Sequence, residues 1–565
     1  MSGGSAVGTA AAPPSAASGR VRAWAANPRL PSLLLGIAAA VSGVLLVVLN
    51  SHLTFFIDDW EVLLHRRGIN PDVFLEPHAG HPSMGLVALY KAIQVTFGMS
   101  SVTPYAVAST AVFLLGVVLL YLWMRPRVGA WLALAGALPL LFLGAAYEDL
   151  LTPFQVGYFA PVACGVGALL ALERGHRRDP LLCCALLVAG LTFQTIGLAF
   201  VAGVAVALAL SGRLRRLAWV PVIPTVLYGL WWLGWGHTGD NQFTFDNLAT
   251  APAFVLDGYA ASLSSLLGFA TPGDGALEWG RALLAACVAL AVVRVLALGR
   301  VPRGLWVVLA IGVVFWIMIA LNASYFRSAE TSRYQFLGVV FVLMAAAELA
   351  RGLRPSRAAV GIVLVGAVAA VAGNLLAMRD AYNDLRALTP VVRGDLAGLE
   401  IAADRVDPAL VLDRANSGFD YFTLLDAGSY LSASAKFGSP AYDPSELAAA
   451  PESGRAAADK VLGAALGLQL ERTSLSPAQE SLCRPLDGGA PVTLPPGGAV
   501  LRDRGSAPAP IDLRRYATAN APVQLGNLGP GRAAVLAIPT DGSQVPWQLQ
   551  VPAGAQLDVC GPPQL

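Results

Sequence analysis

The chain has 565 residues, of which 56% are hydrophobic and only 13% are charged, and its formal net charge at pH 7 is +2. A soluble globular domain carries about 25% charged residues, so this composition excludes a single soluble enzyme. The high apolar content also excludes an intrinsically disordered chain, and the small net charge gives no field to attract nucleic acid. An integral membrane protein with a soluble appendage remains.

Residues 1–29 are rich in Ala, Gly, Ser and Pro without an apolar period, which predicts a disordered tail. The apolar run that follows, residues 30–49, is long enough to cross a hydrocarbon core of ~30 Å. No small-residue cleavage site follows it, because the chain continues Asn50, Ser51, His52. A retained first span is therefore favoured over a cleaved signal peptide.

Further apolar runs predict about eleven spans in a transmembrane domain over residues 30–377. The runs lie at about residues 30–49, 103–124, 128–146, 154–172, 180–194, 196–211, 216–235, 279–298, 304–321, 334–350 and 358–377. The stretch 180–211 can also be one long kinked segment, but its two basic flanks favour two short spans that return the chain to the same side.

Arginines crowd one set of loops, and this asymmetry fixes the expected topology. These loops hold Arg20, Arg22, Arg29, Arg125, Arg127, Arg174, Arg177, Arg178, Arg213, Arg215, Arg216, Arg300, Arg303, Arg351, Arg354 and Arg357. The positive-inside rule therefore predicts a multi-pass protein of the cytoplasmic membrane with a cytoplasmic N-terminus. With an odd number of spans, residues after about 378 lie outside.

The C-terminal part is polar and rich in Pro and Gly. Residues 378–482 are expected to form a helical or mixed linker region, with short helices over 380–405 and 445–470. Short alternating segments broken by Pro-Pro, Gly-Gly and Asp-Gly predict a small β-rich module over residues 483–565. Cys483 and Cys560 bracket this module, and an external compartment favours a disulfide between them over two free thiols. The expected fold class is a mainly α polytopic membrane protein with a small extracytoplasmic α+β or β-rich C-terminal domain.

The first external loop, residues 51–102, holds most of the histidines together with several carboxylates. Asp58 and Asp59 lie just beyond the first span, where two like charges raise the pKa of at least one of them. Such a shift tunes a general base toward neutral pH; the alternative is a solvated helix cap. The stretch 82–97, which carries Lys91, has apolar residues at helical spacing and is expected to lie on the outer membrane surface.

A second external loop supplies Glu148 and Asp149, and Gln155 follows at the top of the next span. This loop can equally be a plain acidic turn. Carboxylates from two loops on one face of a membrane indicate a site at the outer interface.

The third external loop brings Arg327 and Arg333 close together. Arginine recognises phosphate through a bidentate fork. For Arg333 and Tyr334, which begin a span, interfacial anchoring is the alternative.

No cofactor is assigned from the sequence. His78 and His81 have weak metal-ligand spacing, but neither a cysteine set nor a His-Glu-x-x-His helix accompanies them, so a dedicated zinc site is disfavoured. A divalent cation at Glu148 and Asp149 stays open. The chain lacks a Walker A loop and a dinucleotide fingerprint. Its cytoplasmic loops are too short for a nucleotide sugar, so any sugar donor must come from the membrane.

Over about residues 30–377 the chain resembles the GT-C class of integral membrane glycosyltransferases, which includes protein mannosyltransferases and aminoarabinose transferases. The resemblance lies in Asp58 and Asp59 after span one, the surface helix from His81-Pro82-Ser83-Met84 to Phe97-Gly98, Glu148 with Asp149, and Ser332-Arg333-Tyr334. His-Pro-Ser stands where the family has His-Pro-Pro. The resemblance implies an acidic residue of the first loop as base and a polyprenyl-phosphate-linked sugar as donor.

The leading hypothesis is thus an inverting glycosyltransferase in which Asp58, or less favourably Asp59, takes a proton from a glycan, lipid or protein acceptor. The candidate substrate-binding residues are His78, His81, Lys91, Glu148, Asp149, Gln155, Arg327, Arg333 and Tyr334. The alternatives are a transporter or flippase for a lipid-linked glycan, and an assembly scaffold whose external module binds glycan, with Trp547 stacking on a sugar. Transporters tend to have internal repeats and charges at the membrane midplane, and neither is evident here.

Overall fold

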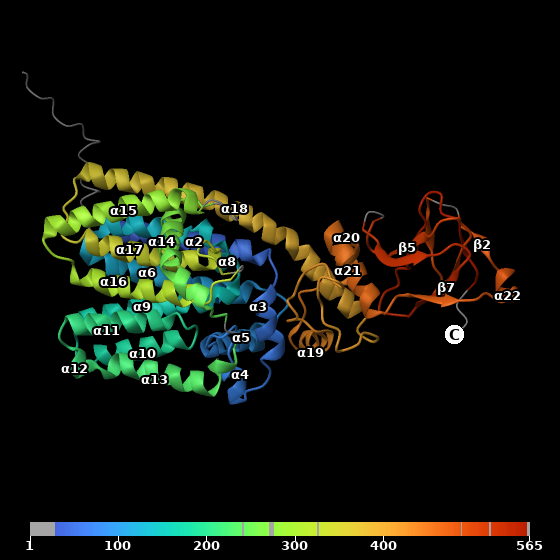
Figure 1. Cartoon of the computed structure of the whole chain (residues 1–565), viewed down its shortest axis with the longest axis horizontal. Helices are drawn as coiled ribbons and strands as arrows, with labels where there is room; N and C mark the ends of the chain where they lie inside the picture. The colour runs from blue at the N-terminus through green and yellow to red at the C-terminus, as the bar shows by residue number, and fades with distance from the viewer. Residues whose placement is uncertain are drawn as a thin grey trace, which may run out of the picture.

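The computed structural model describes residues 29–239, 242–270, 276–324, 327–486, 489–518 and 521–561. The predicted tail lies outside these residues except for Arg29. The described chain is mainly helical, with a β-rich part near the C-terminus (Figure 1).

Among the described residues, seven helices are long and apolar enough to cross a membrane. They are α2 (Leu30–Ser51), α6 (Thr103–Val128), α9 (Val156–Arg174) with the turn before it, α15 (Ala276–Leu298), α16 (Arg303–Ala320), α17 (Ser332–Leu349) and α18 (Arg357–Ile401). An eighth is counted if α7 (Ala130–Leu141) and the segment Gly144–Leu151, which meet at 43°, form one broken span. A membrane-associated protein follows from these apolar helices.

The remaining predicted spans are helical but short. They are α10 (Asp179–Leu191), α11 (Gly197–Leu210) and α13 (Trp219–Gly234), of 13, 14 and 16 residues. At 1.5 Å per residue each is about 20–24 Å long, less than a ~30 Å hydrocarbon core. The count of about eleven spans is therefore not confirmed, although the stretch 180–211 does form two helices rather than one.

The loop between α2 and α6, which the sequence predicts to be external, contains α3 (Ile57–Trp60), the π-helix η1 (Glu61–His65), α4 (Pro71–Leu75) and α5 (Met84–Phe97). The helix expected over 82–97 is α5. Its buried side chains Leu86, Tyr90 and Ile93 belong to a hydrophobic core. The loops between the later helices hold η2 (Gly144–Ala146), α8 (Tyr147–Leu151), η3 (Pro153–Gln155), α12 (Leu214–Leu217), η4 (Gly236–Thr238) and α14 (Phe245–Leu266).

Helix α18 continues for 45 residues, from the apolar bundle into the C-terminal part (Figure 1). We expected a span to end near residue 377 and a separate helix to cover 380–405. The two predicted segments form one helix, which includes the polar residues that follow the apolar run, such as Arg379 and Asp380. Pro390 lies inside the helix without ending it.

Beyond α18 the chain forms α19 (Ala427–Phe437), α20 (Pro444–Ala449) and α21 (Glu452–Ala465), followed by two antiparallel sheets, with the short helix α22 (Pro477–Glu480) between the first two strands. One sheet has the order β1 (Leu470–Thr473), β7 (Ala533–Ile538), β4 (Gly497–Asp503), β9 (Leu557–Val559), β2 (Arg484–Pro485). The other has the order β3 (Pro491–Thr493), β8 (Gln548–Gln550), β5 (Ala509–Arg514), β6 (Val523–Leu528). Because β1 pairs with β7, the β-rich part begins before the expected boundary at residue 483. A disulfide joins Cys483 to Cys560.

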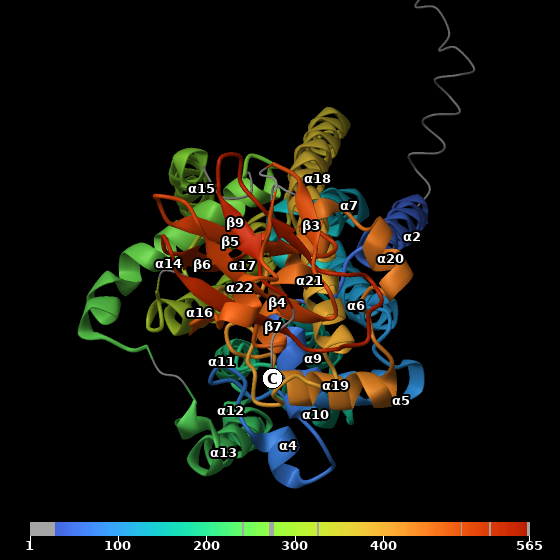
Figure 2. The same cartoon turned by 90° about the vertical axis from the view of Figure 1, so that its right-hand side faces the viewer.

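Two large hydrophobic cores organise the molecule. One fills the apolar bundle, and the other joins the first external loop to the region after α18. Trp60 meets Tyr430 edge to face with ring centroids 6.0 Å apart, and the Met99 amide donates to the Phe437 carbonyl. Figure 2 shows α19 beside α5. The loop that carries Asp58 and Asp59 is therefore packed between the apolar bundle and the region after α18.

Candidate functional site

The two adjacent aspartates of α3 face different surroundings. Asp59 is 1% exposed; it accepts hydrogen bonds from the Tyr90 hydroxyl at 2.6 Å and from the Phe56 amide at 3.0 Å. Burial raises the pKa of Asp59 to about 7, with a small further contribution from the charge of Asp58. Asp59 thus caps α3 from inside the core, so the alternative of a helix cap fits its position, although this cap is buried rather than solvated.

Asp58 points to a more open environment. Its side chain is 36% exposed, and its Oδ1 lies 3.7 Å from Nε2 of His78. It also interacts electrostatically with Tyr158 and Arg333, which come from α9 and α17. Of the two carboxylates, Asp58 is the one that interacts with His78 and with groups of α9 and α17.

The two histidines are presented by a tight hairpin. The backbones of His78 and His81 bond to each other in both directions, and the turn residues Ala79 and Gly80 have φ of 47° and 80°. Two consecutive positive φ angles are those of a type I′ turn, in which Gly is favoured and Ala is strained. The hairpin carries both imidazoles to the centre of the site.

His81 is neutral at physiological pH. Burial lowers its pKa to about 3, with smaller contributions from Arg327 and His78. Its Nδ1 lies 3.0 Å from the Thr195 hydroxyl, in the turn between α10 and α11. His81 can therefore offer or accept one hydrogen bond without a charge.

The loop with Glu148 and Asp149 contacts the start of α17, a contact that the sequence did not predict. The Arg333 guanidinium pairs with Glu148 at 2.8 Å, and the Glu148 amide donates to Ser332. Asp149 is buried, and neither of its carboxylate oxygens has a hydrogen-bond partner among the described residues. Arg333 is thus already occupied by a carboxylate, which leaves Asp149 as the unsatisfied polar group of the pair of loops.

A cavity of about 390 Å³ opens beside this cluster, within the range of small-molecule sites. His81, Thr195, Asn322, Arg327 and Tyr334 supply its polar groups. Its apolar wall comes mainly from α13 and α16, through Tyr228, Trp232, Phe315, Met318 and Ile319. The Arg327 side chain makes no ion pair or hydrogen bond with any other described residue.

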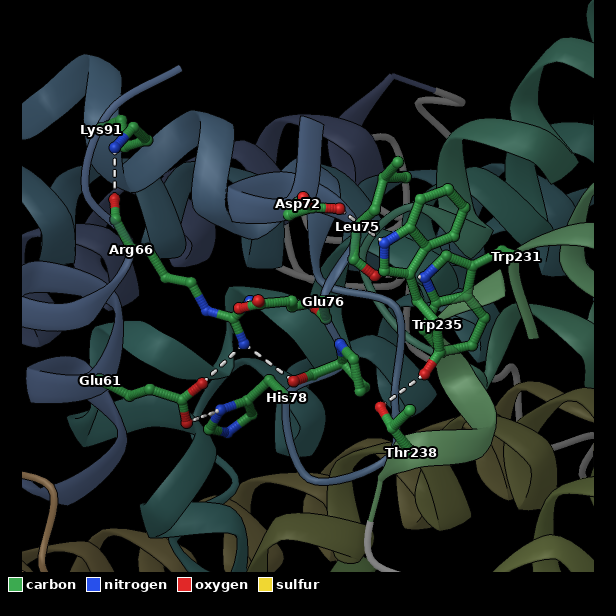
Figure 3. Close-up of polar contacts among 11 residues, drawn as sticks. Glu61, Arg66, Asp72, Leu75, Glu76, His78, Lys91, Trp231, Trp235 and Thr238 are labelled. Carbon is green, nitrogen blue, oxygen red and sulfur yellow. Dashed lines mark hydrogen bonds and ion pairs between the residues drawn. The ribbon is translucent and has the colours of Figure 1, made fainter. Parts of the chain in front are cut away.

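The other predicted site residues lie farther from this cavity. Gln155 is buried beside His78 and His81, and its Oε1 has no partner within the described chain. Lys91 donates to the Arg66 carbonyl and so supports the first loop (Figure 3). Trp547 is only 2% exposed, so its ring is core rather than a surface for stacking a sugar.

Within the described ranges, only Cys483, Asp558 and Cys560 bring three potential ligand atoms within 4.8 Å of one another. The two cysteines are bonded to each other, and Asp558 pairs with Arg502 and Arg504. Glu148 and Asp149 do not form such a group with a third residue.

Sequence reasoning missed Glu61 and Arg66 as site residues. Glu61 contacts His78 and Arg66 (Figure 3). A usable signal was the spacing of Asp58 and Glu61, since residues three apart on a helix share a face. Tyr158 and Thr195, in apolar stretches, gave no signal.

The chain matches no protein-family model, and no curated protein matches it significantly.

Proposed function

We propose that this protein is a membrane glycosyltransferase that moves a sugar from a polyprenyl-phosphate donor to an acceptor hydroxyl at the outer face of the cytoplasmic membrane. The observation that carries the proposal is the cavity lined by Tyr158, a residue within electrostatic range of Asp58. It combines the Arg327 guanidinium, which has no side-chain partner among the described residues, with an apolar wall. An isolated phosphate would need only the guanidinium, and a lipid without a phosphate would need only the apolar wall.

The cavity suits a lipid phosphate in its arrangement. Arg327 would face the phosphate, and the charge-assisted hydrogen bonds of a guanidinium are the strongest that a side chain offers to phosphate oxygens. Trp232 lines the cavity and is half-exposed, so the apolar wall continues to the outside of the bundle. The first isoprene units would lie along α13 and α16, with the rest of the chain in the bilayer.

Asp58 is the better candidate for the base. Its charge acts on Tyr158, which lines the cavity, whereas the Asp59 carboxylate accepts hydrogen bonds from Tyr90 and the Phe56 amide. In the proposed step the acceptor oxygen bonds to C1 of the sugar and its proton passes to Asp58. The bond between C1 and the phosphate oxygen breaks, and its electron pair leaves with the phosphate, where Arg327 stabilises the growing charge.

The remaining groups would bind the acceptor. Asp149 has two unused carboxylate oxygens in a buried position, and such groups favour a polar ligand. The pair of Arg333 and Glu148 would fix the loop that presents it. The proposal places the N-terminus in the cytoplasm and the region after α18 outside, as the arginine distribution predicts.

The test compares Asp58→Asn with Asp59→Asn in membranes that contain normally folded protein. Polyprenyl-phosphate sugars labelled in the sugar serve as donors, and transfer to endogenous glycan, lipid and protein is counted. Loss of a positioned base lowers a rate by about 10²–10⁴-fold, so we expect that loss in Asp58→Asn and a much smaller one in Asp59→Asn. Full transfer by Asp58→Asn would refute the assignment, and labelled lipid that crosses the membrane without transfer would favour a flippase.

A further inference from the structure

His78 lies between two carboxylates. Its Nδ1 is 2.5 Å from Oε2 of Glu61 on one side, and its Nε2 is 3.7 Å from Oδ1 of Asp58 on the other. The ring packs against Phe154 with centroids 4.8 Å apart. The side chain is only 13% exposed, so its orientation is set by these contacts rather than by solvent.

Glu61 is in turn held by Arg66 (Figure 3). The Arg66 side chain is 5% exposed, and its guanidinium reaches Glu61 at 2.7 Å, the Pro77 carbonyl at 2.8 Å and the Glu76 carboxylate at 3.1 Å. Arg66 thus fixes Glu61 and the backbone just before His78 together. The two terminal nitrogens of Arg66 donate to four acceptors, the carboxylates of Glu61 and Glu76 and the carbonyls of Glu76 and Pro77, so the network has little freedom to rearrange.

We propose that Glu61 and Arg66 are positioning residues that hold His78 as an imidazolium against Asp58, and that this ion pair orients the Asp58 carboxylate toward the cavity. This assignment rests on the proposed function for its catalytic meaning, but the contact itself can be tested without any transfer reaction. With this assignment, side chains of alternating charge contact one another through the first loop in the order Arg66, Glu61, His78, Asp58.

The charges that face His78 favour its protonated form. Burial alone lowers the pKa of His78, but the hydrogen bond and charge of Glu61, with the charge of Asp58, outweigh burial and the opposing Arg66, so the net pKa lies above its usual value. His81 is the remaining titratable neighbour, and it is neutral. Burial raises the pKa of Glu61, yet its contacts with His78 and then Arg66 hold it at about 2.

The contact is tested by titrating His78 itself. The full-length protein is labelled in its histidine rings and placed in lipid nanodiscs, and the His78 resonance is identified by its loss in His78→Gln. A neighbouring opposite charge shifts a pKa by about 1–3 pH units, so Glu61→Gln should lower the His78 pKa by at least about one. Glu61→Asp, which keeps the charge, should recover part of that fall. Glu76→Gln is the matched control because Glu76 contacts Arg66 but makes no hydrogen bond or ion pair with His78. An equal pKa in Glu61→Gln and Glu76→Gln would overturn the assignment.

The catalytic meaning is tested by the pH dependence of kcat/KM. If the imidazolium orients Asp58, activity falls as His78 loses its proton, so the alkaline limb in Glu61→Gln should move to lower pH by the amount measured for His78. A merely structural defect would lower the whole profile without moving its limb, and that result would refute the positioning role. If the wild-type protein transfers no sugar, the proposed function fails, whereas the histidine titration still decides whether Glu61 controls His78.

Discussion

Replacing Asp59 by Asn should make the protein less sensitive to alkaline pH. Asp59 is the buried carboxylate of α3, and burial raises its pKa from 3.8 to about 7. Because the folded-state pKa lies above the unfolded value, the neutral acid stabilises the folded state fully only below pH 3.8, and this contribution is lost as the pH rises from 3.8 to about 7. The change from 3.8 to about 7 corresponds to about 4 kcal/mol, at 1.36 kcal/mol per pH unit.

An asparagine in the same place keeps the shape and stays neutral. Its side chain can still accept one of the two hydrogen bonds that Asp59 accepts, from Tyr90 or from the Phe56 amide. We therefore expect wild type and Asp59→Asn to differ little below pH 3.8, whereas at pH 5 the variant should already be more stable by about 1.6 kcal/mol, since 1.2 pH units separate 3.8 and 5. At pH 8.5 the variant should be more stable by up to about 4 kcal/mol.

Thermal unfolding of the two proteins in one detergent, scanned from pH 5 to pH 9, measures the difference. Asp58→Asn serves as the control because its side chain is partly exposed and paired with His78. A constant difference in Tm between wild type and Asp59→Asn over this range would refute the reasoning, since it would mean that Asp59 does not titrate on unfolding.

Three further results are expected. Arg327→Gln should weaken binding of polyprenyl phosphate by about 10- to 100-fold, because a hydrogen bond to a charged group contributes about 1.5–3 kcal/mol. The same variant should leave polyprenol binding unchanged. Equal losses for both lipids, measured by tryptophan fluorescence, would place the phosphate elsewhere. Ala79→Gly should raise Tm, since the φ of 47° costs alanine about 1 kcal/mol. Ala456→Gly, in the interior of α21, is the control and should lower Tm. A change in Tm of the same sign in both variants would contradict the backbone strain at Ala79. Replacing Cys483 and Cys560 by Ser should destabilise the β-rich part by about 4 kcal/mol, from the separation of 77 residues, and unchanged resistance to limited proteolysis would show that the packing alone holds it.

Much of the fold follows from local patterns. Each apolar run became a helix, and the amphipathic stretch before Gly98 became α5, because both depend on residues three and four apart in the chain. The limits of α18 could not be predicted in this way. Its second half is stabilised by packing against α21, a contact between segments far apart in the sequence.

The sequence indicates which residues belong to the candidate site better than it indicates what each of them does. The placement of acidic and basic residues on one set of loops indicated Asp58, Glu148 and Arg327 before any contact was known. Asp59 rather than Asp58 is buried because α3 packs against Tyr90. Arg333 rather than Arg327 is paired among the described residues because Glu148 reaches Arg333. The contact of Glu61 with His78 requires the chain to reverse at the hairpin, and an alanine with positive φ gives no sequence signal for such a turn.

The uninterrupted α18 also sets a distance. Its 45 residues give a rod of about 68 Å at 1.5 Å per residue, of which a ~30 Å hydrocarbon core takes less than half. Because α21, which leads into the sheets, packs along α18, the proposed membrane orientation holds the β-rich part at a fixed distance from the bilayer. An insertion of two residues in the polar half would raise it by about 3 Å and turn it by roughly 200° about the helix axis. Under the proposed function, a large acceptor must pass beside this structure, and the length of α18 then limits the acceptors that fit.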